Sequence, residues 1–146
     1  MAKIGDGPLN LEQSQAALSW FLDHWSKFGF GPGLVFEKDG DQAIGICGFK
    51  QLKLCGELVY DLGFMFQKPH WGKGYATEIS RTLLSDGFST LGFSEVHAHT
   101  EKMNLASKKV LSKVGMRYVK NFERNAKDHE LWVITASEFV NPDFPR

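Results

Sequence analysis

The sequence lacks the features that mark secreted and membrane proteins. It has only two cysteines, Cys47 and Cys55, in 146 residues, too few for the disulfide framework of a small secreted domain. No apolar run approaches the roughly 20 residues of a membrane-spanning helix, and residues 1–6 lack the apolar core of a secretory signal. We therefore expect a cytoplasmic protein with no membrane partner and with reduced thiols, although the two cysteines flank a predicted turn that could bring them face to face.

An excess of charge of one sign is also missing. Lys plus Arg and Asp plus Glu are 17 each, so the balance gives no reason to expect nucleic acid as a partner. Internal repeats, linkers and low-complexity tracts are absent as well, and the length fits one domain over residues 1–146. Hydrophobic residues make up 42% and aromatic residues 13% of the chain, which excludes a disordered protein and favours a well-filled core or a lined cleft.

The periodicity of apolar residues predicts three helices. Asn10 begins a capping-box pattern for the first helix, expected over residues 11–28. The apolar residues of that helix recur at helical spacing and form one stripe: Leu18, Phe21, Leu22, Trp25 and Phe28. The other two helices are expected over residues 73–88 and 104–114, and Gly115 is placed to end the last one in a left-handed conformation.

Six strands are predicted between and after these helices. Their expected ranges are 34–36, 43–49, 58–66, 95–100, 117–122 and 130–134. A hairpin-type turn at residues 38–41 favours an antiparallel arrangement for the first three strands. The order of elements predicts a mixed sheet covered by helices, in the α/β (α+β) class.

A glycine-containing segment, Gln67–Glu78, lies between a predicted strand and a predicted helix. Gly72 and Gly74 allow backbone N–H groups to approach a ligand closely, and the helix N-terminus behind them favours an anion such as a pyrophosphate. Lys73 could add a positive charge. The segment matches neither a P-loop nor a dinucleotide fingerprint, and by itself it is also compatible with an ordinary turn.

A second segment, Asn104–Met116, has polar residues at the start of a predicted helix. Asn104 is placed to cap that helix, and Ser107 lies one turn further on. Taken alone, they indicate no more than a helix cap and a solvated hydroxyl.

Taken together, the residues resemble the GNAT acetyltransferase superfamily, in the branch of the RimJ/RimL-type N-acetyltransferases. The resemblance extends from Ile4 to the C-terminus and is strongest at Trp71–Glu78 and Asn104–Met116. Ile4–Pro8 and Trp25 with Gly29–Gly31 are also similar to that branch. It implies a GNAT-like, mostly antiparallel sheet flanked by helices.

The resemblance also implies a reaction. An acetyl group would pass from acetyl-coenzyme A to a primary amine of a small molecule or a peptide N-terminus, by direct attack in a ternary complex and without a metal. The absence of a convincing Cys–His or Ser–His pairing agrees with a mechanism that needs no covalent enzyme intermediate. The alternative is a non-catalytic relative that binds coenzyme A or an acyl-coenzyme A.

The implied cofactor site comprises one strand end, the glycine segment and the start of the last helix. Its residues are Met65, Phe66, Trp71, Gly72, Lys73, Gly74, Tyr75, Ala76, Asn104 and Ser107. The strand backbone would pair with the pantetheine arm, and the N–H groups of the glycine segment would hold the pyrophosphate. Trp71 stands where the family usually has Gln or Arg, so one side-chain contact to the pyrophosphate is expected to be missing.

The implied catalytic residues are Asp61, Asn104 and Ser107. Ser107 would act as general acid toward the leaving thiolate, and Asn104 would bind the pantetheine or an ordered water. Asp61 is the candidate base. It stands where the branch usually has Glu, and its shorter side chain suggests a relaying water. The alternative for Asp61 is a solvated carboxylate at the end of a strand.

Two histidines and two lysines allow more than one interpretation. His97 and His99 alternate on one strand and therefore share a face. With no third ligand in view they are expected to line the cleft rather than to bind a metal, and one of them could act as the base. Lys108 and Lys109 could reach the adenosine 3′-phosphate, or they could form a solvated helix face.

The sequence departs from the resemblance at its start. Members of the branch usually have a strand and a helix before the segment similar to Ile4–Pro8, and here three residues precede it. The fold is therefore expected to lack that strand and helix. An uncovered sheet edge would follow, and a homodimer or strand exchange is expected to cover it.

Overall fold

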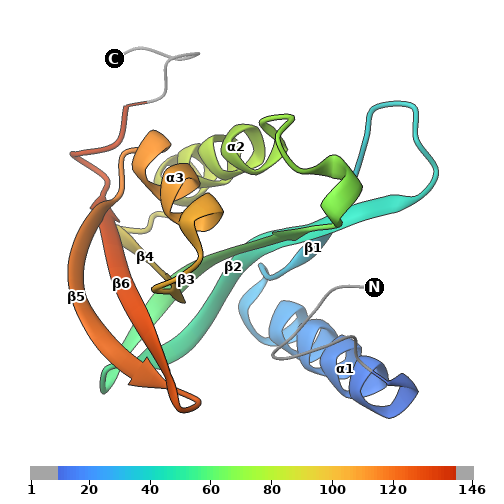
Figure 1. The fold of residues 1–146 in the computed structure, drawn as a ribbon, viewed down its shortest axis with the longest axis horizontal. Coiled ribbons are helices and arrows are strands. Elements are labelled where there is room, and N and C mark those ends of the chain that lie inside the picture. The colour runs from blue at the N-terminus through green and yellow to red at the C-terminus, as the bar shows by residue number, and fades with distance from the viewer. Residues whose placement is uncertain (1–9, 141–146) are drawn as a thin grey trace.

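The computed structural model describes residues 10–140, which form a six-stranded sheet with helices on both faces (Figure 1). The similarity at Ile4–Pro8 lies outside the described residues. The elements are α1 (Leu11–Phe28), β1 (Gly33–Phe36), β2 (Ala43–Leu54), β3 (Glu57–Phe66), the 3-10 helix η1 (Lys68–His70), α2 (Tyr75–Ser89), β4 (Glu95–Glu101), α3 (Leu105–Lys113), β5 (Arg117–Arg124) and β6 (Lys127–Thr135). This order confirms the predicted α/β fold.

Local chemistry explains where the helices begin and end. The Asn10 side chain accepts a hydrogen bond from the Gln13 N–H, and Gln13 returns one to the Asn10 N–H, so the predicted capping box of α1 is present. After α3, Gly115 adopts a φ of +95°. The Met116 N–H then bonds back to the Leu111 carbonyl, as in a Schellman-type end.

The sheet has the strand order β1-β2-β3-β4-β6-β5. All neighbouring pairs are antiparallel except β3 and β4, which are parallel and register only at Asp61 and His97. Beyond that point β3 remains paired with β2, and β4 remains paired with β6. The two central strands therefore diverge and open a wedge in the middle of the sheet.

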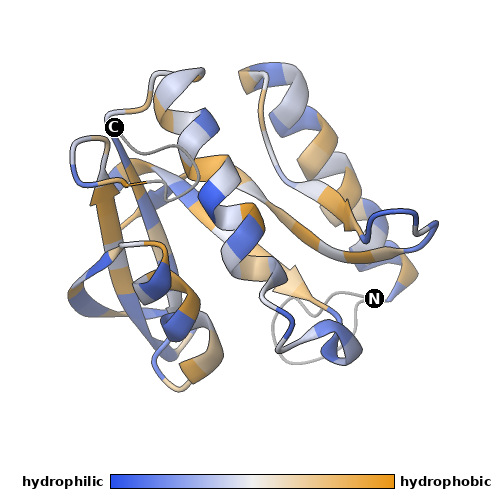
Figure 2. Cartoon of the chain, turned by 90° about the horizontal axis from the view of Figure 1, so that it is seen from above, coloured by the Kyte–Doolittle hydropathy of each residue, from blue (hydrophilic) through white to orange (hydrophobic). Residues whose placement is uncertain are grey.

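Helices α2 and α3 cover one face of the sheet, and α1 lies on the other (Figure 1). The main core fills the space under α2 and α3, where Leu84, Val96, Leu111 and Ile134 are all but completely buried. Each such side chain contributes about 1.5–3 kcal/mol of burial free energy. Figure 2 shows the polar turn between β1 and β2 projecting from the molecule, away from the apolar strands. None of the described helices is long and apolar enough to cross a membrane.

Only part of the predicted apolar stripe of α1 is shielded from solvent, with Phe21 and Phe28 half-buried. Leu18 and Leu22 are 56% and 59% exposed, whereas His24 is 4% exposed. The Nε2 of His24 accepts a hydrogen bond from the Gln51 N–H at 2.8 Å, and its Nδ1 lies 2.8 Å from the Phe30 carbonyl oxygen. The imidazole thus satisfies a β2 backbone donor, which a hydrocarbon side chain could not do.

Candidate active site

Two adjoining cavities open where β3 and β4 diverge. They share four lining residues, Phe64 and Met65 from β3, and Asn104 and Ser107 at the start of α3. Their volumes, about 330 Å³ and 460 Å³, lie in the range of small-molecule sites. We call the larger cavity the loop-side cavity, because the glycine segment lines it, and the other the sheet-side cavity.

The loop-side cavity brings together nearly all the predicted cofactor residues. Its lining includes Met65, Phe66, Trp71, Gly72, Gly74, Tyr75, Ala76, Asn104 and Ser107. Gly72 and Gly74 have φ values of +77° and +81°, a conformation that favours glycine. Gly74 is the N-cap of α2 and provides no side-chain cap, so the first N–H groups of α2 have no intrahelical acceptor. Glycines of positive φ and a helix start without a side-chain cap are features that suit an anion.

The side chains of Lys73 and Trp71 lie differently with respect to the cavity. Lys73 is exposed and is not among the residues that line the loop-side cavity. Its ammonium lies 6.0 Å from the centre of the Tyr75 ring. Trp71 is 60% exposed, and its indole N–H donates to the Phe66 carbonyl at 2.7 Å. Because that is its only polar hydrogen, the indole presents an apolar surface to the cavity.

A polar contact joins the start of α2 to the segment after β1. The Tyr75 hydroxyl donates to a Glu37 carboxylate oxygen at 2.6 Å. That hydrogen bond is the main cause that lowers the pKa of Glu37 below its usual value, and it raises the pKa of Tyr75. His70 Nδ1 lies 3.4 Å from the other oxygen of Glu37. Glu37 thus holds the side chain of Tyr75, the first residue of α2, in place.

The start of α3 has the predicted cap. The Asn104 side chain accepts from the Ser107 N–H at 3.1 Å, and the Ser107 residue lines both cavities. Lys108 donates to Glu130 at 3.1 Å and to the Lys102 carbonyl at 3.2 Å. It therefore forms a half-buried ion pair rather than a solvated helix face, and Lys109 is the lysine of the pair that lines the loop-side cavity.

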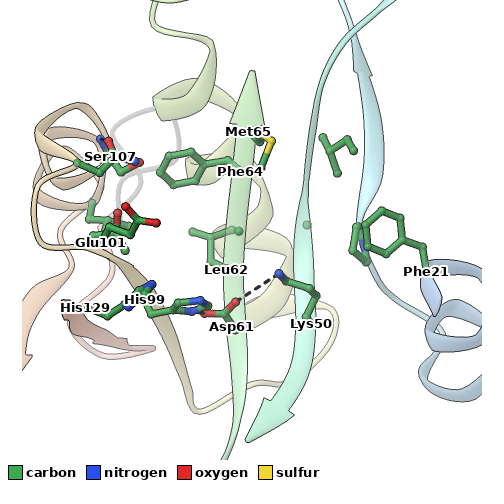
Figure 3. A pocket seen from close by; sticks show the side chains of 17 residues that line it. Phe21, Lys50, Asp61, Leu62, Phe64, Met65, His99, Glu101, Ser107 and His129 are labelled. Carbon is green, nitrogen blue, oxygen red and sulfur yellow. Dashed lines mark hydrogen bonds and ion pairs between the residues drawn. The ribbon is translucent and has the colours of Figure 1, made fainter. Parts of the chain in front are cut away.

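Asp61 lies at the point where β3 and β4 diverge and is 1% exposed. The alternative of a solvated carboxylate at a strand end is wrong. One oxygen, Oδ1, lies 2.9 Å from His99 Nδ1. The other, Oδ2, has no hydrogen-bond partner among the described residues and lies 3.9 Å from Lys50 Nζ. Figure 3 shows Asp61 between the two side chains at the base of the sheet-side cavity.

His99 links Asp61 to Arg124, the last residue of β5. Its Nε2 lies 3.0 Å from Arg124 Nη1. A guanidinium has donors only, so Nε2 is the acceptor in this contact, and Nδ1 carries the hydrogen that is donated to Asp61. His97 shares the face of β4, as expected, but its Nδ1 is buried without a hydrogen-bond partner. Within residues 10–140 no group of three or more His, Cys, Asp or Glu is placed to hold a metal ion.

The row formed by Lys50, Asp61, His99 and Arg124 crosses several strands. The sequence indicated Asp61 and the paired histidines separately, but it did not predict that His99 and Asp61 are bonded, or that Lys50 and Arg124 join them. The signal was weak because these residues are far apart in the chain. His97 and His99 alternate on one strand, so a parallel register that pairs His97 with Asp61 places Asp61 and both histidines on one face of the sheet. That register is not visible in the sequence.

The two cysteines lie in different environments. Cys47 is buried in the core, and burial raises the pKa of its thiol to about 12. Cys55 is exposed in the turn between β2 and β3. Both are free thiols, and the expectation of a small buried residue in the core is confirmed for Cys47 and wrong for Cys55.

Comparisons with known proteins agree with this geometry. The family model for the acetyltransferase (GNAT) domain matches residues 1–117. The uncharacterized protein YkkB of Bacillus subtilis is 30% identical over 112 residues, which cover 77% of this chain. The chain spans 65% of the length of that relative.

Solved structures share the fold. A structure from Bordetella pertussis assigned to the GNAT-family acetyltransferases has a TM-score of 0.81 at 19% identity and covers 90% of this chain and 81% of its own. The ribosomal-protein-S5-alanine acetyltransferase of Vibrio fischeri has a TM-score of 0.74 at 14% identity and covers 93% and 80%. At these identities the likeness supports the fold of the chain.

Proposed function

Because the chain belongs to the GNAT acetyltransferase family, we propose that it is an N-acetyltransferase that uses acetyl-coenzyme A to acetylate a primary amine. The proposal takes residues 1–146 as one domain. It places this domain in the branch of the RimJ/RimL-type enzymes, and the likeness of its fold to the S5-alanine acetyltransferase supports that placement. The observation that carries it is the meeting of two cavities at the divergence of β3 and β4, with Asn104 and Ser107 on both.

The loop-side cavity is the proposed cofactor site, and its residues fit acetyl-coenzyme A. The N–H groups from Gly72 to Ala76, at a helix start without a side-chain cap, suit the pyrophosphate, and the left-handed glycines leave room for it. Past its single pairing with β4, the end of β3 at Met65 and Phe66 has backbone groups on its inner edge that suit the amide-containing pantetheine arm. When bound, acetyl-coenzyme A supplies an activated thioester that an amine can attack.

The sheet-side cavity is the proposed acceptor site. The amine forms a bond to the acetyl carbon as the carbon–sulfur bond breaks, so one proton must leave the nitrogen and one must reach the thiolate. Asp61, held by His99, is the proposed proton acceptor through a water, because its carboxylate is too buried for direct contact. Ser107 is the proposed donor to the thiolate, since it lines both cavities, and Asn104 positions it through the capped helix start.

Two measurements test this proposal in order. Calorimetric titration should show micromolar binding of acetyl-coenzyme A, about −8 kcal/mol, and no comparable binding of ATP. Thiol release should then follow when a primary amine is added. A folded sample that binds neither acetyl-coenzyme A nor coenzyme A would contradict the proposal.

One observation favours a second function, a coenzyme A-binding protein without turnover. Both oxygens of Asp61 face protein cations or the imidazole, and Oδ2 is buried. If Lys50 and His99 keep the carboxylate from accepting a proton, the cofactor would bind and no amine would release thiol. Binding without release for a broad set of amines would establish this alternative.

A further inference from the structure

We propose that the acceptor is an amine with a carboxylate close to its amino group, as in a free amino acid, and that Lys50 binds this carboxylate. This inference rests on the proposed function, since it assigns the substrate class of the sheet-side cavity.

Lys50 projects from β2 into the sheet-side cavity, and its side chain is 30% exposed (Figure 3). Its ammonium forms an ion pair with Asp61 Oδ2 at 3.9 Å, which is beyond hydrogen-bond distance. The ammonium can therefore donate hydrogen bonds to a ligand while it stays beside Asp61.

The lining of the sheet-side cavity carries charges of both signs. It includes two carboxylates, Asp61 and Glu101, and one lysine, Lys50. Each carboxylate has a cation beside it, since Asp61 lies next to Lys50 and Glu101 lies 3.4 Å from Lys127 Nζ. Lys127 is outside the lining, so Lys50 is the cation that the cavity presents to a carboxylate of the ligand.

The same balance argues against a polyamine. A polyamine has at least one ammonium besides the reacting amine, and that second cation would need a carboxylate of its own. Both carboxylates in the lining already have cationic neighbours. Placing a further positive charge near Lys50 would be unfavourable.

The groups that would bind the amine and the carboxylate lie close together in this cavity. The reacting amine must come within one water of Asp61 to lose its proton, and Lys50 is the register partner of Asp61 on the neighbouring strand. A carboxylate on Lys50 would therefore be only a few bonds from the amine. A peptide N-terminus has a neutral amide at that position. The cavity wall of Phe21, Pro32 and Ile46 is apolar and suits an aliphatic side chain.

The test compares leucine, leucinamide and spermidine as acceptors, with thiol release from acetyl-coenzyme A as the readout. Leucine should have a kcat/KM at least roughly tenfold above the other two, the value of one hydrogen bond between charged groups. Lys50→Met should lower kcat/KM for leucine by about 10- to 100-fold through KM, with leucinamide unaffected. Lys50→Arg should restore most of the preference. Lys53→Met, on the exposed part of the same strand, should behave as the wild type.

Several results would overturn the inference. One is equal or better turnover of leucinamide or spermidine by the wild type. Another is a Lys50→Met variant that loses leucine and leucinamide turnover alike, which would mean that Lys50 acts only on Asp61.

A failure of the proposed function is distinguishable from these outcomes. If no amine releases thiol, leucine and leucinamide are titrated into the protein saturated with coenzyme A. Preferential binding of leucine that Lys50→Met abolishes would support the inference without turnover, and absence of that preference would contradict it.

Discussion

The two cavities are built from different parts of the polypeptide. The loop-side cavity presents backbone N–H groups at a helix start, and the residues from Trp71 to Thr77 that supply much of its lining lie in one short segment. The sheet-side cavity presents side chains from separate strands, with Lys50, Asp61 and His99 in one row. A site formed by backbone N–H groups tolerates most side-chain substitutions but not a change of backbone conformation. A site formed by side chains can lose its function when one polar atom is replaced. The proposed cofactor and acceptor functions should therefore be separable by mutation.

The largest effect is expected from Asp61→Asn. The amide oxygen can still accept from His99, so the fold and the loop-side cavity should remain intact. Because the amide cannot take a proton, kcat should fall by about 10³-fold, with acetyl-coenzyme A affinity unchanged in calorimetry. Asp86→Asn, on the exposed face of α2, is the matched control. Loss of cofactor binding in Asp61→Asn would show that the two cavities are not independent.

The difference between the cavities also explains what could be predicted from the sequence. The helix starts at Asn10 and Asn104 and the end at Gly115 follow from local hydrogen bonds, and all three were predicted. The glycine segment was recognised for the same reason, because its geometry depends on residues that are adjacent in the chain. The Lys73 side chain could not be placed in this way, since the direction of an exposed side chain is not fixed by the segment.

The sheet-side row required tertiary information. Asp61 and His99 are bonded across 38 positions of the chain, and only the register of β3 with β4 brings them together. For β2 the predicted end at residue 49 was too early, because Lys50 and Lys53 interrupt the apolar pattern while their backbone continues to pair with β3. The burial of His24 on α1 could not be predicted from the apolar pattern either, since His24 is buried through two hydrogen bonds rather than through hydrophobicity.

The second-largest effect is expected from Gly74→Leu, which changes the backbone site alone. Gly74 and Gly56 have nearly the same φ, +81° and +82°, and a Cβ added to either would meet nothing within 4 Å. Both substitutions should therefore cost about 1–2 kcal/mol of folding free energy. Gly74→Leu should in addition weaken acetyl-coenzyme A binding about 100-fold, or about 2.7 kcal/mol, because the side chain would occupy the ligand's approach. Equal cofactor affinity of the Gly74→Leu and Gly56→Leu variants would contradict the placement of the pyrophosphate.

A smaller effect is expected from Ser107→Ala, at the residue that the cavities share. A thiolate leaves with little assistance because thiol pKa values are low, near 8.5. The loss in kcat should therefore be about tenfold, below the usual range for a general acid. Cofactor affinity should stay within a factor of about two, because the cap uses the Ser107 N–H and not its hydroxyl. Ser112→Ala, exposed on the same helix, should leave kcat unchanged, and an unchanged kcat in Ser107→Ala would remove the residue from the mechanism.

The smallest effect is expected from Tyr75→Phe, which removes the side-chain bond that supports the loop-side cavity. In the wild type this bond lowers the pKa of Glu37 from its usual 4.5. A lowered folded-state pKa contributes stability above the unfolded value, and that contribution is lost as the pH falls through the folded value. The unfolding temperature of Tyr75→Phe should therefore be slightly below that of the wild type at pH 7, and the difference should narrow below pH 4.5.

Tyr118→Phe is the control for that measurement, because the Tyr118 hydroxyl donates to the neutral Asn121 side chain. Its effect on the unfolding temperature should not change between the two pH values. Titration of the Glu37 carboxyl carbon by NMR should place its pKa higher in Tyr75→Phe than in the wild type. A Glu37 pKa that does not move would mean that the carboxylate is held by His70 and Lys73 instead. The glycine segment would then be supported by charged side chains rather than by the tyrosine hydroxyl. In that case the loop-side cavity, like the sheet-side cavity, would depend on charged side chains.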